Sequence, residues 1–455
     1  MTDRSLGNQV EREDHQSSLG AQKVPILVFL LLSLMILVPI ELSIRAGSLF
    51  LPLYRALAFL LTFYVIFKFF EQRKQLRIFD NLILIQGFWF LACEILKRGS
   101  AGFEPGVSYF VETVTPYFVI RFLLKSPGQL FAFPNLVFIL MIPAILLAFP
   151  EAVILQERFV HDIARSISGY YYWIQEDYRL GMLRAASIFE HPILYGLFCS
   201  SMISLVFATA KTNVSGVFKS AVLAFGCILS ASSAPILTMI IQLAFLVGER
   251  CSRFLQHRAM LLIGSCAFVF TALSFLSNRG PIGIIATSLA LNPQSGYYRI
   301  HIWENGIDDV LANPFIGIRP EEWTRPGWMS PSIDNNWLLV AMKGGFPGII
   351  LILMILYLIM RKLYAHDKVS QRLDGLRQAL CFTFISLFLA GATVAFFGKM
   401  LPFFFILLGY GGAVAHYIMS TSDQDVTSAE DEAPAKRVRR AQYTRKRSKP
   451  QLTKT

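Results

Sequence analysis

Long apolar runs alternate with shorter polar connections along most of the chain. A helix that crosses about 30 Å of hydrocarbon needs about 20 mostly apolar residues, because each backbone amide must find its hydrogen-bond partner within the segment. This pattern predicts about twelve transmembrane helices, although the two windows on either side of Ser230 are also compatible with one interrupted helix. The windows lie near 24–44, 48–70, 79–96, 106–124, 133–150, 188–210, 216–231, 234–249, 259–277, 336–360, 376–396 and 399–419.

The composition agrees with a membrane protein. Of 455 residues, 54% are hydrophobic and only 16% are charged, which is unlike an ordinary soluble domain. We therefore expect an all-α, polytopic integral membrane protein. It would have a cytoplasmic N-terminal tail at 1–23, a transmembrane domain at 24–419 and a basic, disordered cytoplasmic tail at 420–455. No small-residue cleavage site follows the first apolar run, so this run is expected to be retained as a span.

Basic residues in the connections indicate the orientation of the spans. Most of them fall on one side if both termini are cytoplasmic, as the positive-inside rule requires, and Lys97 and Arg98 are the exceptions. The same topology places the two longest polar connections, 150–185 and 278–335, on the outward side. Both are rich in tyrosine and tryptophan, and long loops of this kind are often functional.

The second long connection contains apolar residues at steps of three and four, the spacing of one helical face. This spacing predicts an amphipathic helix at the outer membrane interface that ends at Asn313 and Pro314. Its predicted apolar face consists of Ile300, Trp303, Ile307, Val310 and Leu311.

Three other features limit the range of functions that the sequence allows. The six cysteines lack paired or metal-ligand spacing and are interpreted as small core residues. The basic runs after Lys436 contribute much of the net charge of +12 and are expected to touch anionic membrane lipids, not nucleic acid, because nothing aromatic accompanies them. Glu94, Glu112 and Arg121 fall in or near apolar segments, where we expect pairs between helices.

Polar residues also gather at the outward ends of the spans. Arginine binds phosphate through a bidentate fork and stays charged at any relevant pH. A polyprenyl diphosphate suits such a place, since its tail requires apolar helices and its diphosphate requires cations at the interface. No Walker loop, zinc motif or dinucleotide fingerprint is present, and no cofactor is expected. The gathered residues are Arg184 and His191; Arg299, His301, Trp303 and Glu304; and Asp334, Asn335 and Lys343.

Three motifs stand in order along the chain: RAASIFEHP before a long span, RIHIW followed by NPFIGI, and DN, nine residues, GFPG. Together they resemble the O-antigen ligase and Wzy-type polymerase superfamily of bacterial envelope glycosyltransferases. The ligase signature begins with His, which is followed by one of Asn, Ser or Gln. Nine residues of any kind come next, then Gly, two residues of any kind, and finally one of Gly, Thr or Tyr. Asn335, Gly345 and Gly348 fit it, whereas Asp334 stands where the ligases carry histidine. The family often has a serine-arginine step at an outward turn, but the turn SASSAP at 230–235 has no arginine.

The resemblance implies a GT-C-like, metal-independent transfer at the periplasmic face of the bacterial inner membrane. A glycan would pass from undecaprenyl diphosphate to a sugar hydroxyl, a reaction that needs stabilisation of the leaving diphosphate and a base for the hydroxyl. Arg184 and Arg299 would stabilise the diphosphate. Asp334 would be the base or would orient the acceptor, with His191 and His301 as rival bases.

These candidates have plainer structural alternatives. Arg299 could snorkel to lipid headgroups, and Arg184, just outside its span, could be a flanking anchor. Asp334 or Asn335 is also a good helix N-cap, and His191 before Pro192 is typical of a helix start. The glycines near 345 are typical of close helix packing or a kink. The residues expected to bind substrate are His191, His301, Trp303, Asn335, Lys343, Gly345 and Gly348.

The function that we expect is polymerisation of lipid-linked repeat units for O-antigen or exopolysaccharide. Expected partners are the undecaprenyl-diphosphate-linked glycan, membrane lipids, and polysaccharide chain-length or export proteins. A ligase that transfers glycan to lipid A core or to a protein is the first alternative. A flippase or transporter for a lipid-linked sugar is the second; transporters usually place charged sites near the membrane midplane and carry internal repeats, which this sequence does not suggest.

Overall fold

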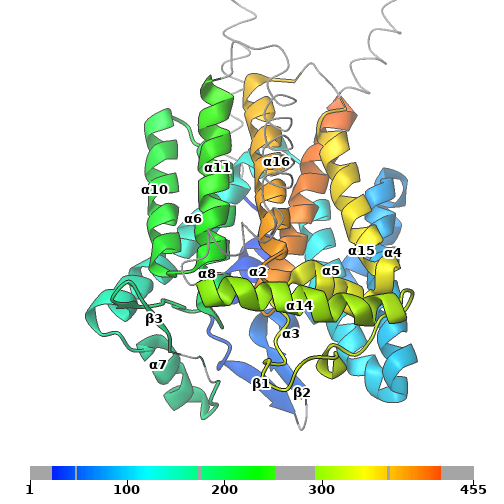
Figure 1. Cartoon of the computed structure of the whole chain (residues 1–455). Coiled ribbons are helices and arrows are strands. Elements are labelled where there is room, and N and C mark those ends of the chain that lie inside the picture. The colour runs from blue at the N-terminus through cyan, green and yellow to red at the C-terminus, as the bar shows by residue number, and fades with distance from the viewer. Residues whose placement is uncertain are drawn as a thin grey trace, which may run out of the picture.

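The computed structural model describes residues 23–46, 49–172, 174, 176–251, 293–365 and 369–421. The predicted span 259–277, the start of the second long connection and nearly all of both terminal tails lie outside these residues. The described chain is a bundle of helices with two small antiparallel hairpins (Figure 1).

The helices follow the predicted windows closely. They are α2 (Ile26–Leu37), α3 (Leu53–Glu71), α4 (Ile78–Arg98), α5 (Phe103–Leu123), α6 (Pro127–Phe149), α7 (Phe159–Ser168), α8 (Pro192–Ser201), α9 (Ile203–Ala208), α10 (Asn213–Leu229), α11 (Ser233–Cys251), α14 (Pro293–Ala312), α15 (Asn336–Leu363), α16 (Gln371–Gly391) and an unlabelled helix, Met400–Thr421. The hairpins pair β1 (Ser43–Ala46) with β2 (Leu49–Pro52), and β3 (Tyr178–Arg179) with β4 (Met182–Leu183).

Within the described residues, seven helical segments are long and apolar enough to cross a membrane. One of them, Ile78–Leu123, contains both α4 and α5. The helices α2 and α10 and the segment Pro192–Ala208 are apolar but shorter. The chain is therefore an all-α multi-pass membrane protein, and the total of about twelve spans stays a prediction. The windows on either side of Ser230 are separate helices, α10 and α11, that stand side by side (Figure 1).

Helices α4 and α5 pack antiparallel. A Cβ atom at Gly87 would meet Val114 and Phe110, and one at Gly106 would meet Leu91, so residue numbers rise on one helix as they fall on the other. The expectation of pairs between helices is confirmed for two of the three residues: Arg121 on α5 binds Asp80 on α4 at 3.2 Å, and Glu112 on α5 binds Arg55 on α3 at 2.8 Å. Glu94 instead pairs within α4, with Lys97 and Arg98.

Helix α14 lies across one end of the bundle, at a steep angle to the upright helices, and α7 and both hairpins lie at the same end (Figure 1). We call this the α14 end. Lys97 and Arg98, the exceptions to the charge rule, lie here too. Lys97 donates to the carbonyl oxygens of Ile318 and Lys343, and Arg98 donates to Glu321. They are bound by the loops around α14, which explains why they depart from the loop-charge pattern.

Helix α14 packs on the bundle through only part of its predicted apolar face. Trp303 and Leu311 are exposed, whereas Ile302, Gly306 and Val310 are buried. The reason is the contact with α15: a Cβ atom at Gly306 would lie 2.6 Å from Met342 and 2.7 Å from Leu338, so the helices meet where the side chain is absent. A helix contact made at a glycine cannot be predicted from the spacing of apolar residues, because glycine has no side chain.

Helix α15 is broken at Gly345, whose φ of 64° and ψ of −168° are not helical. The loop after α14 binds into the break: Phe346 N–H donates to Pro314 O at 2.7 Å, and Ile318 N–H donates to Met342 O at 2.6 Å. A Cβ atom at Gly345 would lie 2.1 Å from the carbonyl oxygen of Phe315. The NPFIG motif and the GG step therefore form one junction at the α14 end.

Candidate functional site

Arg184 is held by a buried ion pair beneath it. Glu151, fully buried after α6, binds Arg158 and accepts the backbone N–H groups of Ala186 and Ser187 at 3.0 and 2.7 Å. Arg158 also donates to Arg184 O at 2.8 Å. These bonds fix the backbone of RAAS and therefore the direction of the Arg184 side chain.

The guanidinium of Arg184 reaches the turn between α10 and α11. It donates to Ser232 Oγ at 2.7 Å and lies 3.5 Å from Ser230 O. This is the SASSAP turn that lacks an arginine of its own. The structure thus supplies a cation to this turn from the segment before α8.

Arg179, in the β3–β4 hairpin, extends the positive charge. Asp177 Oδ2 is shared by Arg184 at 2.8 Å and Arg179 at 3.3 Å. Burial, and then the neighbouring Arg179, lowers the pKa of Arg184. Burial also lowers the pKa of Arg299, against the opposing effect of Asp334, and Arg179 adds to the lowering. Arg179 therefore lies within electrostatic range of arginines from two distant segments.

Arg299 and Asp334 come from α14 and from the residue pair before α15. Arg299 Nε is buried and has no hydrogen-bond partner among the described residues, while Asp334 Oδ1 accepts from Ser332 Oγ at 2.8 Å. Asn335 is the N-cap of α15, because its side-chain oxygen accepts the N–H of Leu338 at 3.0 Å. The capping alternative thus applies to Asn335 and not to Asp334.

We call Arg179, Arg184 and Arg299 the arginine cluster. Asp177 binds Arg179 and Arg184, and the charge of Asp334 acts on Arg299 without an ion pair among the described contacts. Because guanidinium stays charged even when its pKa is lowered, the cluster carries an excess of positive charge at the α14 end. Such an arrangement can bind an anion with several oxygens, as a diphosphate has.

His191 begins α8 as its N-cap, with Nδ1 accepting the N–H of Ile193 at 3.1 Å. The helix-start interpretation is therefore confirmed. Burial, with the charges of Arg184, Arg158 and Arg179, lowers the pKa of His191 to about 4. The ring is neutral at physiological pH and is a weak base.

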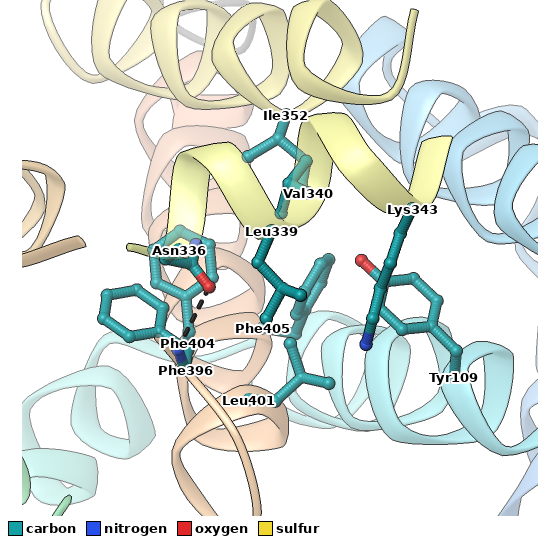
Figure 2. Close-up of a pocket in the computed structure, with 10 residues that line it drawn as sticks. All are labelled: Tyr109, Asn336, Leu339, Val340, Lys343, Ile352, Phe396, Leu401, Phe404 and Phe405. Carbon is teal, nitrogen blue, oxygen red and sulfur yellow. Dashed lines mark hydrogen bonds between the residues drawn. The ribbon is translucent and has the colours of Figure 1, made fainter. Parts of the chain in front are cut away.

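Lys343 lies two turns into α15, at one end of a small hollow with a cavity volume of about 20 Å³ (Figure 2). Its ammonium is 5.9 Å from the ring centroid of Tyr109. At the other end, Asn336 Oδ1 accepts the N–H of Phe396 at 3.1 Å. The rest of the wall is apolar: Leu339, Val340, Ile352, Leu401, Phe404 and Phe405.

Four other sequence-predicted residues have contacts of a different kind. His301 is exposed, binds Glu304 at 3.1 Å and packs edge-on against Trp328; Trp303 is 40% exposed. Gly345 forms the helix break, and a Cβ atom at Gly348 would lie 3.0 Å from Phe90. These glycines meet the protein itself, as the packing alternative predicts.

Two charged residues near the site had no signal in the sequence reasoning. Arg179 is one, because only the hairpin brings it to the cluster. Glu190 is the other: it is 3% exposed, and its carboxyl carbon lies 3.0 Å from where a Cβ atom would stand at Gly398. Burial raises the pKa of Glu190, against the opposing charges of Lys399 and His161. Its place before His191 in the quoted motif was the available hint.

The fold defines a multi-pass helical membrane protein, with Arg179, Arg184 and Arg299 at the α14 end of its bundle. Residues 218–353 match the family model described as O-antigen ligase. The match confirms the resemblance to the O-antigen ligase and Wzy superfamily and indicates a membrane enzyme of the ligase or polymerase type. It includes Arg299, Asp334 and Lys343, and lies after Arg179 and Arg184. Comparison with curated proteins gives no match.

Proposed function

We propose that this protein is a periplasm-facing glycosyltransferase that polymerises undecaprenyl-diphosphate-linked repeat units of O-antigen or exopolysaccharide. The observation that carries the proposal is the shared carboxylate of Asp177, which binds Arg184 at 2.8 Å and Arg179 at 3.3 Å, with Arg179 also within electrostatic range of Arg299. The family match supports the reaction type. The bacterial inner membrane, with both termini cytoplasmic, is the proposed location.

In this mechanism the arginine cluster holds the donor diphosphate. The bond between the anomeric carbon and the diphosphate oxygen breaks, and its electron pair leaves with the diphosphate, whose growing charge the guanidinium groups stabilise. The acceptor hydroxyl oxygen forms the new bond to the anomeric carbon and gives up its proton. Asp334, beside Arg299, is the proposed base or orients that hydroxyl.

Deletion of the gene tests the reaction. A polymerase deletion accumulates single lipid-linked repeat units, a ligase deletion accumulates long lipid-linked chains, and a flippase deletion traps units on the cytoplasmic side. The ligase is kept as the second candidate because the matching family model carries that description.

Complementation of the deletion tests the residues. Arg184→Ala, Arg299→Ala and Asp334→Asn are expected to leave single units unextended. Arg319→Ala is the matched control, because the Arg319 side chain is 42% exposed and its ion pair among the described residues is with the nearby Glu322. Normal chain length in all three site variants would refute the assignment.

A further inference from the structure

The β3–β4 hairpin lies beside the end of a membrane span. Helix α6 and the helical turn that follows it form the candidate span Pro127–Ile154, and the hairpin lies near this end of α6, at about the level of α14 (Figure 1). Two hydrogen bonds connect them. Gln156 Nε2 donates to Gly181 O at 3.2 Å, and Tyr178 Oη donates to Gln156 O at 3.3 Å. The tip of the hairpin is therefore bound two residues beyond the end of the span.

The surface of the protein at this place is apolar and is not covered by other described residues. Leu146, Phe149 and Val153 are exposed at steps of three and four, which is the spacing of one helical face. In a membrane span such a face contacts lipid. Ile154, 65% exposed, continues this surface to the end of the span, and Leu180, 75% exposed, follows it at the hairpin tip beside the bond to Gln156. The lipid-facing surface of α6 thus extends onto the hairpin.

The leucine at the hairpin tip is unusual for its backbone conformation. Leu180 and Gly181 have φ of 54° and 77° and connect the paired residues Arg179 and Met182, so the turn needs two left-handed residues. Asparagine, aspartate and glycine are the usual residues in such a turn. A leucine here combines a costly backbone conformation with an exposed apolar side chain. Contact with lipid chains would offset part of this cost, because it removes the leucine side chain from water.

The residues next to the tip suit the headgroup region of a membrane. Tyr178 is half exposed and its hydroxyl group is hydrogen-bonded, an arrangement that is typical of tyrosine at a membrane interface. Arg179 precedes Leu180 and binds Asp177 at 3.3 Å. Apolar side chains at the tip with polar and charged groups behind them are the pattern of a segment that enters a leaflet from its surface.

We propose that the tip of the β3–β4 hairpin is a membrane anchor that inserts into the leaflet on the α14 side. Leu180 contacts the acyl chains, and Tyr178 and Arg179 lie at the depth of the headgroups. Membrane lipid is the partner because the exposed tip continues the lipid-facing surface of α6. One consequence rests on the proposed function: the anchor holds Arg179 at the depth where a diphosphate carried by a lipid of that leaflet lies.

Photo-crosslinking of the full-length protein in palmitoyl-oleoyl phosphatidylcholine nanodiscs tests the insertion. The photoreactive residue p-benzoylphenylalanine replaces one residue at a time, and its adducts with lipid are quantified by mass spectrometry. Position 180 is expected to give lipid adducts at a level within about twofold of Ile154, at the end of the span. Ile167, exposed on α7 and farther from the bundle helices, is the matched control and is expected to give at least about fivefold fewer (Figure 1).

Two outcomes of this experiment would overturn the proposal. Lipid adducts at position 180 as rare as those at Ile167 would show that the tip lies in water. Adducts at position 180 with a second copy of the protein, in place of lipid, would assign the apolar surface to self-association.

Asparagine at position 180 separates the anchor from the turn. Leu180→Asn suits the left-handed backbone and removes the apolar side chain, so the hairpin is expected to fold. With p-benzoylphenylalanine at Tyr178, Leu180→Asn is expected to lower the lipid adducts at least about threefold. This pair keeps the test valid if p-benzoylphenylalanine at position 180 prevents assembly. Equal adducts with leucine and asparagine would contradict the anchor.

The rate of glycan transfer tests the consequence for Arg179. Leu180→Asn is expected to lower the rate several-fold, and Ile167→Asn is expected to leave it unchanged. A wild-type rate for Leu180→Asn would show that the anchor does not position Arg179. Lipid adducts at position 180 together with normal transfer by Arg184→Ala and Arg299→Ala would support the anchor and refute the proposed function.

Discussion

His191 shows how the arginine cluster affects a neighbouring residue. Its pKa is about 4 in the folded protein, against about 6.5 for a histidine in an unfolded chain. As the pH falls from about 6.5 towards 4, the unfolded state takes up a proton that the folded state does not, so the folded protein loses stability. The expected result is a melting temperature that declines over this range.

His191→Asn keeps a capping side chain and removes the titration. Its melting temperature, measured in detergent by intrinsic fluorescence, should decline less between pH 7 and pH 4 than that of the wild type. An identical decline in both proteins would show that His191 is not held neutral.

Glu151 is expected to be the most sensitive acidic residue near the site. Glu151→Ala leaves Arg158 buried without its carboxylate and leaves two backbone N–H groups without their acceptor. Breaking a buried pair in this way should lower the free energy of unfolding by roughly 3–5 kcal/mol. Asp162→Ala removes an exposed partner of Arg165 and should cost less than about 1 kcal/mol. Thermal unfolding of both variants checks this difference; equal melting temperatures would contradict it.

The site residues that belong to a sequence motif could be predicted, whereas a residue that reaches the site only through a turn could not. Arg184 and Arg299 follow from RAASIFEHP and RIHIW. Arg179 joins them only because Leu180 and Gly181, with φ of 54° and 77°, reverse the chain into a two-residue hairpin. Such short strands have no periodicity from which a sequence pattern could be detected.

The junction between α14 and α15 depends on two glycines. Gly317 and Gly345 have φ of 74° and 64°, and a Cβ atom on either would lie about 2 Å from a backbone carbonyl oxygen of the other segment. Alanine at either position is expected to lower the free energy of unfolding by about 1–3 kcal/mol. Gly327→Ala, with open space around it, is the control. A melting temperature of Gly345→Ala within a degree of this control would show that the junction tolerates a side chain.

At the scale of secondary-structure elements, the helix α14 could be predicted from the sequence, but the face that it packs against the bundle could not. The three-and-four spacing predicts α14 correctly, and the Asn313–Pro314 step lies where it ends. Which face of α14 is buried depends on Gly306, where the helix contacts Met342 of α15. The apolar pattern of α14 alone cannot predict this contact, because it also depends on the neighbouring helix. The break at Gly345 likewise depends on the loop that binds into it.

At the scale of the whole molecule, apolar run length predicted the described helices well, since membrane burial demands one helix for each run. The short helices α2, α8 and α9 show the limit of that rule, because a buried apolar run need not be one long span. The central helix Met400–Thr421 is buried from Phe403 to Leu408 and positions the hollow from within.

The central claim is that the arginines from the β3–β4 side and from α14 act on one diphosphate. It is tested most directly by the rate of glycan transfer in purified protein, with lipid-linked units isolated from the deletion strain as substrate. Arg184→Ala and Arg299→Ala are each expected to lower the rate roughly 10²–10³-fold. Because both stabilise the same leaving group, the double variant should lose clearly less than the product of the two effects. Wild-type rates in the single variants, or losses that multiply fully, would contradict the account.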